Sequence, residues 1–233
     1  MISFYWIAFL FGLFFAMKIH VEYYTASQRS HTAGNDVIES SVERNRDQYT
    51  FLNASNEYFE FQVLVRGNGP CGHSGRIADD VFSRPCTPVF HFHEDQVEIF
   101  TVLEGEMGYT METNEPKDLF LLPSDSPLRI AQGIGHTFWN QNKEEDLRVL
   151  VRVEPPSPLN RRFFETITGL QRDGLDNLLQ MFVVLEDART YPASPPRFIA
   201  KLLVKMGAFI GRFYGYRPYY SAYSELDKVS ESI

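Results

Sequence analysis

Three histidines and one glutamate are spaced in a way that could bind a metal ion. His91 and His93 are separated by one residue, Glu98 follows five positions later, and His136 lies in a second segment. Imidazole nitrogens bind Zn, Cu, Fe and Ni, and a carboxylate oxygen extends this range to Mn. The four residues therefore predict a site for one divalent transition metal such as Fe, Mn, Zn or Ni.

The spacing also indicates which elements carry these residues. In a β-strand, residues two apart face the same side, so His91 and His93 point together while Phe92 points away. Glu98 falls on the next apolar stretch, residues 97–103, and His136 falls on a later one. Ligands on three strands can converge only inside a barrel or a sandwich.

The rest of the central region has the pattern of an antiparallel β protein. Short apolar stretches recur, each bounded by Gly, Pro, Asn or Asp, and many short strands at close spacing are typical of a sandwich or barrel. These stretches are residues 58–66, 106–113, 118–123, 128–133 and 147–155. From Arg161 onward the apolar residues instead recur with helical periodicity.

The two segments that carry the candidate ligands resemble a known pair of motifs. The first reads His-x-His-x4-Glu-x6-Gly and ends at Gly105, and the second reads Gly-x2-His-x3-Asn, from Gly133 to Asn140. Together they resemble the signature motifs of single-domain proteins of the cupin superfamily. The second motif departs from the usual pattern at Asp125 and Ala131, where glycine and proline are common.

This resemblance covers about residues 58–153 and implies a mainly β fold, a small antiparallel jelly-roll barrel. It implies that His91, His93, Glu98 and His136 are the metal ligands and that Asn140 supports one end of the barrel. The order of the segments carries a second, weaker resemblance. An apolar N-terminal helix followed by one barrel and a helical C-terminal tail is similar to the arrangement in cupin-domain oxidoreductases of fungal polyketide pathways, including those that make salicylaldehydes.

The strand alternation predicts an apolar pocket beside the metal. Side chains expected on the faces near the ligands are aromatic or aliphatic, and Tyr109 adds a hydroxyl that could donate a proton. The predicted lining is Phe100, Val102, Met107, Tyr109, Met111 and Phe138. Such a lining suits a lipophilic substrate, and a polyketide-derived one in particular, better than a sugar or an oxalate.

These features favour a metal-dependent oxidoreductase that acts on a lipophilic small molecule. A metal with an open coordination position can also act as a Lewis acid, so a cyclase or isomerase is an alternative. A non-catalytic protein that binds a ligand is a third. The net charge of −8 argues against a nucleic-acid partner, because phosphate binding needs a basic face.

The ends of the chain differ from its centre. Residues 1–17 contain no charged side chain and are rich in Phe, Ile and Leu, which predicts a transmembrane helix that anchors the protein in the endoplasmic reticulum or another endomembrane. A cleaved signal peptide is the alternative. Residues 18–50 are expected to form a polar linker, residues 51–155 the barrel, and residues 156–233 a helical extension.

Within the extension, residues 195–220 contain five basic and no acidic side chains. Their apolar side chains fall on one helical stripe: Ile199, Leu202, Leu203, Met206, Ile210 and Phe213. The stripe could pack on the barrel, lie on an anionic membrane or close the barrel mouth. Two further questions stay open, namely whether Cys71 and Cys86 form a disulfide and whether residues 58–66 pair two chains as a homodimer.

Overall fold

The computed structural model describes residues 12, 15–39, 47–68, 88–113, 118–142 and 144–225. In this part of the chain, eleven strands form two antiparallel sheets. One sheet has the order β1-β2-β3-β10-β5-β8, and the other has the order β11-β4-β9-β6-β7. The strands are β1 (Val37–Glu39), β2 (Gln48–Ala54), β3 (Phe59–Val65), β4 (His91–His93), β5 (Val97–Glu104), β6 (Met107–Met111), β7 (Asp118–Leu121), β8 (Leu128–Ile130), β9 (His136–Asn140), β10 (Leu147–Glu154) and β11 (Thr190–Pro192).

The predicted mainly β fold with antiparallel strands is confirmed. Strand β10 shows why: its residues from Leu147 to Val153 are buried at every second position, as expected for a strand with one face toward a core. Val151 is paired with Phe61 of β3 on one side and with Phe100 of β5 on the other. The inward faces of these three strands form the largest part of the hydrophobic core.

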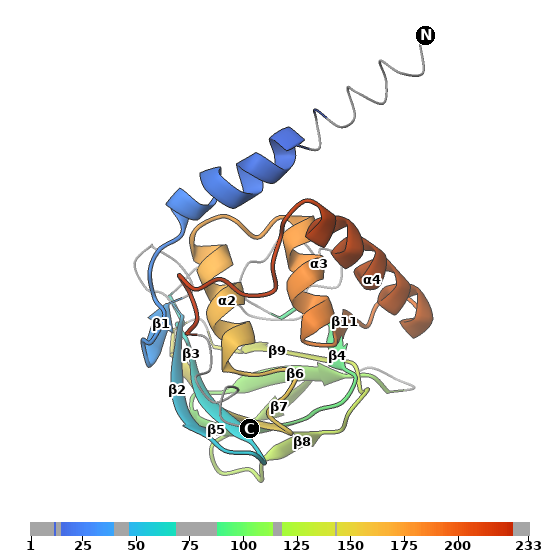
Figure 1. Ribbon diagram of the computed structural model, residues 1–233. Helices are drawn as coiled ribbons and strands as arrows, with labels where there is room; N and C mark the ends of the chain where they lie inside the picture. The colour runs from blue at the N-terminus through green and yellow to red at the C-terminus, as the bar shows by residue number, and fades with distance from the viewer. Residues whose placement is uncertain are drawn as a thin grey trace.

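The strands that carry the four candidate ligands lie in different sheets. Strands β4 and β9 are neighbours in one sheet, where His91 is paired with His136, whereas β5 belongs to the other sheet. A site formed by these residues must therefore lie between the two sheets. Figure 1 shows β4 and β9 close together, and β5 in the separate layer of strands.

Three helices from the C-terminal part of the chain cover the strands in Figure 1. They are α2 (Arg161–Arg172), α3 (Leu178–Asp187) and α4 (Arg197–Phe213). Asn160 and Asn177 cap α2 and α3, because each side chain accepts a hydrogen bond from a backbone N–H of the first turn. Phe163 of α2 and Val184 of α3 belong to the same core as the strands.

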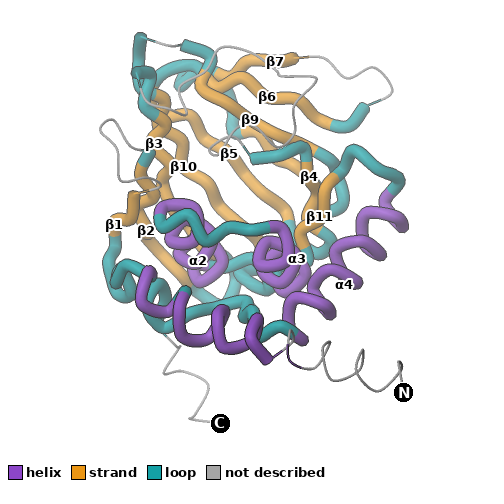
Figure 2. The backbone as a smooth tube through the Cα atoms, turned by 90° about the horizontal axis from the view of Figure 1, so that it is seen from above, coloured by secondary structure: helices purple, strands orange, loops and turns teal. Residues whose placement is uncertain are grey.

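The helical extension and the predicted linker both contribute strands to the sheets. Strand β11 follows α3 and pairs with β4 (Figure 2), while β1 and the first residues of β2 lie within residues 18–50. Hydrogen bonding between strands satisfies backbone groups that a free linker would leave to water. Residues on both sides of positions 50 and 155 therefore take part in the two sheets.

Helix α4 packs on its neighbours with small side chains and exposes its large ones. Its buried face is Ala200, Val204, Gly207, Ala208 and Gly211. A Cβ atom added at Gly207 would lie 2.0 Å from the ring of Phe182, so the glycine permits the close approach of α3. The apolar stripe therefore does not pack on the barrel.

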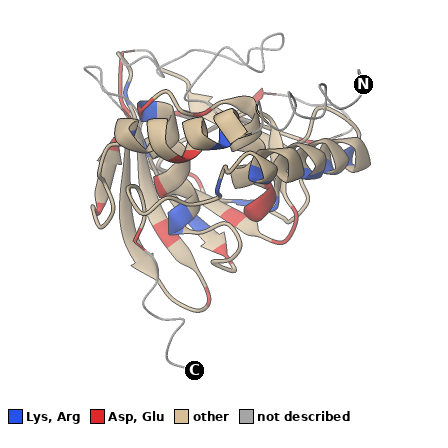
Figure 3. Cartoon of the chain, turned by 45° about the horizontal axis from the view of Figure 1, so that its top comes forward, with Lys and Arg blue, Asp and Glu red and all other residues tan. Residues whose placement is uncertain are grey.

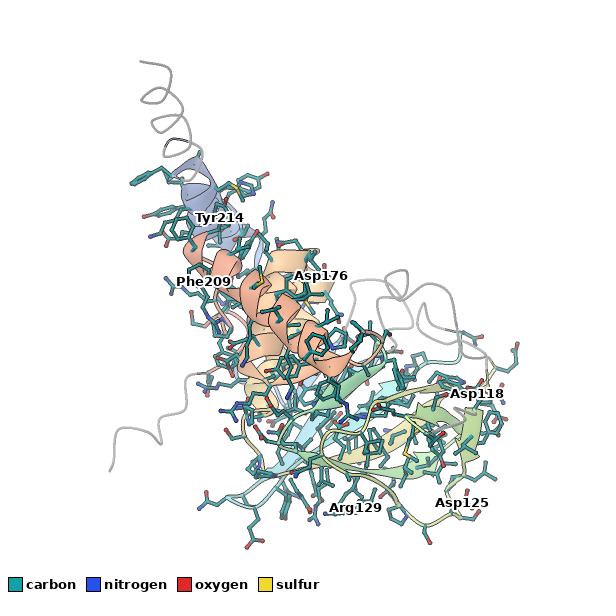
Figure 4. All side chains as sticks on the ribbon, turned by 90° about the vertical axis from the view of Figure 1, so that its right-hand side faces the viewer. Asp118, Asp125, Arg129, Asp176, Phe209 and Tyr214 are labelled. Carbon is teal, nitrogen blue, oxygen red and sulfur yellow. The ribbon has the colours of Figure 1, made fainter. Side chains whose placement is uncertain are left out.

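The outer face of α4 holds most of that stripe. Phe198, Leu202, Leu203, Met206, Phe209, Ile210 and Phe213 are between 42% and 74% exposed. Figure 4 shows Phe209 and Tyr214 at the opposite end of the molecule from Asp118, Asp125 and Arg129.

Cations of α4 are visible along the helix in Figure 3, and several form ion pairs with acids of the body. Arg197 contacts Glu112, Lys201 contacts Glu94, and Arg212 contacts Glu186. These contacts join the helix to the residues that follow β6 and β4 and to α3.

The predicted transmembrane helix and the membrane-anchored localisation were wrong. Across the described residues, no helix combines the length and the apolar character that a membrane crossing requires. The described helical turns after residue 15 run into η1 (His20–Tyr24), a π-helical turn that carries the charged Glu22, and then into the 3-10 turn η2 (Ala26–Gln28). Residues 1–11, 13 and 14 lie outside the described residues, as do Cys71 and Cys86.

Candidate metal centre

The structure brings His91, His93, Glu98 and His136 together, and we call these four residues the ligand cluster. One ligand atom from each lies within 4.8 Å of the others. The Nε2 atoms of His91 and His93 are 3.1 Å apart. A carboxylate oxygen of Glu98 lies 2.7 Å from Nε2 of His136 and 3.3 Å from Nε2 of His93. All four side chains thus present their donor atoms to one point between the sheets.

Two histidines of the cluster have their ring protons fixed by the backbone. Nδ1 of His91 lies 2.7 Å from the carbonyl oxygen of Val89, and Nδ1 of His136 lies 3.0 Å from that of Ile134. A carbonyl oxygen can only accept a hydrogen bond, so each Nδ1 carries the proton. In each ring Nε2 is then the nitrogen that faces the cluster, and it can bind a metal once it carries no proton.

The electrostatics of the cluster also favour a bound cation. Burial, together with the adjacent His136 and His93 rings, holds the pKa of His91 well below its usual range, so this imidazole stays neutral near pH 7. Burial alone would raise the pKa of Glu98, but the neighbouring His93 and His136 rings hold it well below its usual range. The cluster therefore combines a neutral imidazole with an ionised carboxylate, which are the forms that bind metals.

The donor set fits a divalent transition metal. Metal–nitrogen bonds of about 2.1 Å place two neighbouring ligand atoms about 3.0 Å apart at an angle of 90° and about 3.4 Å apart at the tetrahedral angle. The 3.1 Å between the Nε2 atoms of His91 and His93 lies within this range.

The members of the ligand cluster differ in their burial by the described residues. His93, Glu98 and His136 are buried, whereas His91 is only partly buried. The ring of Phe100 meets that of His136 edge-on at 6.2 Å, and Phe138 packs against Phe100 at 5.3 Å. Aromatic side chains thus border the cluster beside His136, and His91 is its most exposed member among the described residues.

The residues predicted to line a pocket lie on the inward faces, but they belong largely to the packed core. Phe100, Val102 and Met107 are buried core residues, and the other three are partly buried against them: Tyr109, Met111 and Phe138. The strand register settles which side of β6 faces inward, because Met111 is paired with His136 and Tyr109 with Phe138. Of the three β6 residues predicted to line the pocket, Met111 is therefore the one paired with a candidate ligand, His136.

Asn140 has the supporting position that the resemblance implies. Its amide donates to the carbonyl oxygens of Val65 and Glu145 at 3.2 and 2.8 Å, and its side-chain oxygen accepts from the backbone of Asn142. These contacts join β9 to the ends of β3 and β10. Satisfied buried amides of this kind hold loops in place, which agrees with a structural role.

Two polar residues near the cluster were not found from the sequence. Thr190 of β11 lies 2.9 Å from Nδ1 of His93 through its hydroxyl oxygen. Gln96 is 1% exposed, and neither polar atom of its amide has a hydrogen-bond partner among the described residues. Gln96 lies two positions before Glu98, and residues 96, 98, 100 and 102 share the buried side of this stretch. No motif signal marks either residue, because an isolated Thr or Gln is common in any chain.

The unpaired amide of Gln96 leads to a stability prediction. A buried polar group without a partner costs about 1–3 kcal/mol, so Gln96→Leu should stabilise the metal-free protein by about that amount. Urea unfolding of the metal-free variant measures the difference. Gln132→Leu, at an exposed glutamine, is the matched control and should change little. A loss of stability in Gln96→Leu would show that the amide is already satisfied by water or by another group.

The chain resembles the cupin superfamily in its ligand spacing and in its two antiparallel sheets, although no family model matches it. A solved double-stranded β-helix protein of Klebsiella pneumoniae aligns with 56% of this chain and 82% of its own, at 14% identity and a TM-score of 0.34.

Two fungal proteins are similar in sequence. An oxidoreductase of Arthrobotrys oligospora is 26% identical over 168 residues, which cover 63% of this chain and 65% of that protein. The epoxidase atD of Aspergillus terreus is 29% identical over 172 residues, which cover 67% of this chain and 52% of that protein. The chain therefore spans between half and two thirds of the length of these relatives, which are both named as oxidising enzymes.

Proposed function

We propose that the protein is a metal-dependent oxidoreductase that acts on a lipophilic small molecule. The observation that carries this proposal is the convergence of three imidazole nitrogens and one carboxylate oxygen within 4.8 Å. The names of the two fungal relatives support oxidation as the type of reaction. At 26% and 29% identity they do not specify the substrate.

The residues of this chain would hold the metal and shield its surroundings. His91, His93, Glu98 and His136 would be its ligands, and a bound redox-active metal with an open position would supply contact between O2 and the substrate. Phe100 and Phe138 exclude water from the inner side of the cluster. The carboxylate of Glu98 offsets part of the metal charge, which lowers the cost of keeping the ion between two apolar sheets.

The surroundings of the cluster favour an apolar substrate. Side chains that border it from β5, β6 and β9 are aromatic or aliphatic, and apolar surface binds apolar ligands best. A phenolic or polyketide-derived compound combines an apolar body with oxygen atoms that can approach a metal. We therefore propose this class of substrate and place the reaction in secondary metabolism.

The proposal is tested by metal content and by oxygen uptake. Protein purified without added metal is analysed for Fe, Mn, Zn, Ni and Cu, then supplied with Fe(II) and a panel of alkyl-substituted phenols and phenolic aldehydes. We expect about one metal per chain and oxygen uptake that depends on at least one compound. Uptake should disappear after treatment with a chelator and return when the metal is restored.

Three outcomes would contradict the proposal in different ways. Conversion of a compound under strict anaerobiosis, without another electron acceptor, would identify a cyclase or isomerase instead. Binding of the compounds that survives removal of all metal, without conversion, would identify a ligand-binding protein. Failure of the purified protein to take up any of the tested metals would remove the basis of the proposal.

A further inference from the structure

We infer that Thr190 is a positioning residue of the metal centre, and that the C-terminal extension thereby completes a site whose ligands all lie in the barrel. The inference rests on the proposed function in one respect, namely that the ligand cluster binds a metal. Thr190 lies 97 residues after His93 in the chain, between α3 and α4. Strand β11 pairs it directly with His93 of β4.

The contact between the two side chains is buried and has a defined direction. The Thr190 oxygen lies 2.9 Å from Nδ1 of His93, and both residues are less than 5% exposed. A hydroxyl has one proton to donate, and that of Thr190 is directed to the carbonyl oxygen of Ala188 at 3.3 Å. With its proton directed there, the Thr190 oxygen accepts the Nδ1 proton of His93.

This direction decides which nitrogen of His93 faces the metal. With the proton on Nδ1, the Nε2 lone pair points to the same place as those of His91 and His136. The other tautomer would put a proton on Nε2, 3.1 Å from Nε2 of His91, where the metal should lie. Backbone carbonyls accept the Nδ1 protons of His91 and His136 and so fix the tautomers of these rings. For His93 the acceptor is the hydroxyl of Thr190, which lies in the C-terminal extension and not in the barrel.

The turn before Thr190 is held in an unusual conformation. Arg189 has a φ of 47°, a left-handed value that is uncommon for a residue with a side chain. Its carbonyl oxygen accepts a hydrogen bond from the backbone of Glu94 at 3.1 Å, and its guanidinium lies 2.6 Å from a carboxylate oxygen of Asp95. Both contacts join the turn to the segment between β4 and β5, so they fix Thr190 relative to His93 and Glu98.

The test compares Thr190→Val, which keeps the shape but removes the hydroxyl, with Thr190→Ser, which keeps the hydroxyl. Co(II) is titrated into the metal-free full chain and followed by its visible absorption. We expect the dissociation constant to rise about 10- to 100-fold in Thr190→Val and to return close to the wild-type value in Thr190→Ser. Thr110→Val, which loses another buried hydroxyl that bonds to Asp118, should bind Co(II) as the wild type does.

A second measurement separates positioning from a general loss of structure. The ¹⁵N chemical shifts of the His93 ring in the metal-free protein should show the Nδ1-protonated tautomer in the wild type and in Thr190→Ser, and a mixture in Thr190→Val. Equal Co(II) affinity and the same His93 tautomer in Thr190→Val would overturn the inference. If instead the wild type fails to bind Co(II), the proposed function fails, and the ring shifts still decide the role of Thr190.

Discussion

His136→Ala is expected to abolish stoichiometric metal binding. The variant removes one of four ligands, and its Nε2 atom lies 2.7 Å from the carboxylate of Glu98 at the centre of the cluster. Loss of a residue that merely orients a ligand costs about 10- to 100-fold in metal affinity, so loss of a ligand should cost more than 100-fold. Glu98→Gln should have a comparable effect, because the neutral amide no longer offsets the charge of the ion.

The measurement is a titration of the metal-free protein with Co(II) or Zn(II), accompanied by elemental analysis after gel filtration. His31→Ala is the matched control, since His31 is an exposed histidine outside the cluster. Its metal content should equal that of the wild type. Full metal content in His136→Ala or in Glu98→Gln would show that the metal binds elsewhere, and the proposed centre would have to be abandoned.

Gly105→Ala should be among the most destabilising single substitutions in the chain. Gly105 has a φ of +81°, and a Cβ atom built on it would lie 2.5 Å from the carbonyl oxygen of Asp146 and 3.1 Å from Cα of Leu147. Both neighbours are backbone atoms at the start of β10, the strand that joins β3 to β5. The left-handed conformation costs about 1–2 kcal/mol and the overpacking about 1–3 kcal/mol, so a loss of roughly 2–5 kcal/mol is expected.

Urea unfolding of the metal-free proteins measures this loss, and Gly174→Ala supplies the comparison. Gly174 also has a positive φ, +67°, but no described atom lies within 4 Å of the position of its missing Cβ. The variant therefore carries the conformational cost without the clash. We expect Gly105→Ala to lose more stability than Gly174→Ala, and equal losses would show that the backbone near Asp146 moves aside without cost.

The glycine that ends the first motif illustrates how motif and structure are related. The sequence shows that a glycine follows Glu98 after six residues, but it does not say why. In the structure, Gly105 turns the chain between β5 and β6, and the backbone of β10 lies where a side chain would be. The requirement comes from a strand more than 40 residues away, which no local pattern can reveal.

Helix α4 shows where a sequence pattern was insufficient. The sequence correctly predicted that its large apolar side chains share one helical face. Periodicity does not say whether that face packs against the rest of the protein or is exposed. The small residues Gly207 and Gly211 allow α3 to approach closely, and that approach leaves the large apolar side chains outside. Packing between two helices decided the orientation, and packing depends on both partners.

The sequence by itself predicted the mainly β fold and the four side chains that the structure brings together, because both predictions rest on local spacing. Alternation along a strand fixes which side chains share a face, such as His91 with His93 on β4 and the inward side of β5. The tertiary structure alone decided the contacts between distant segments: Thr190 against His93, the unpaired amide of Gln96, and the packing of α4. Those contacts depend on which strands and helices become neighbours, and their partners lie too far apart in the chain for any periodic signal to connect them.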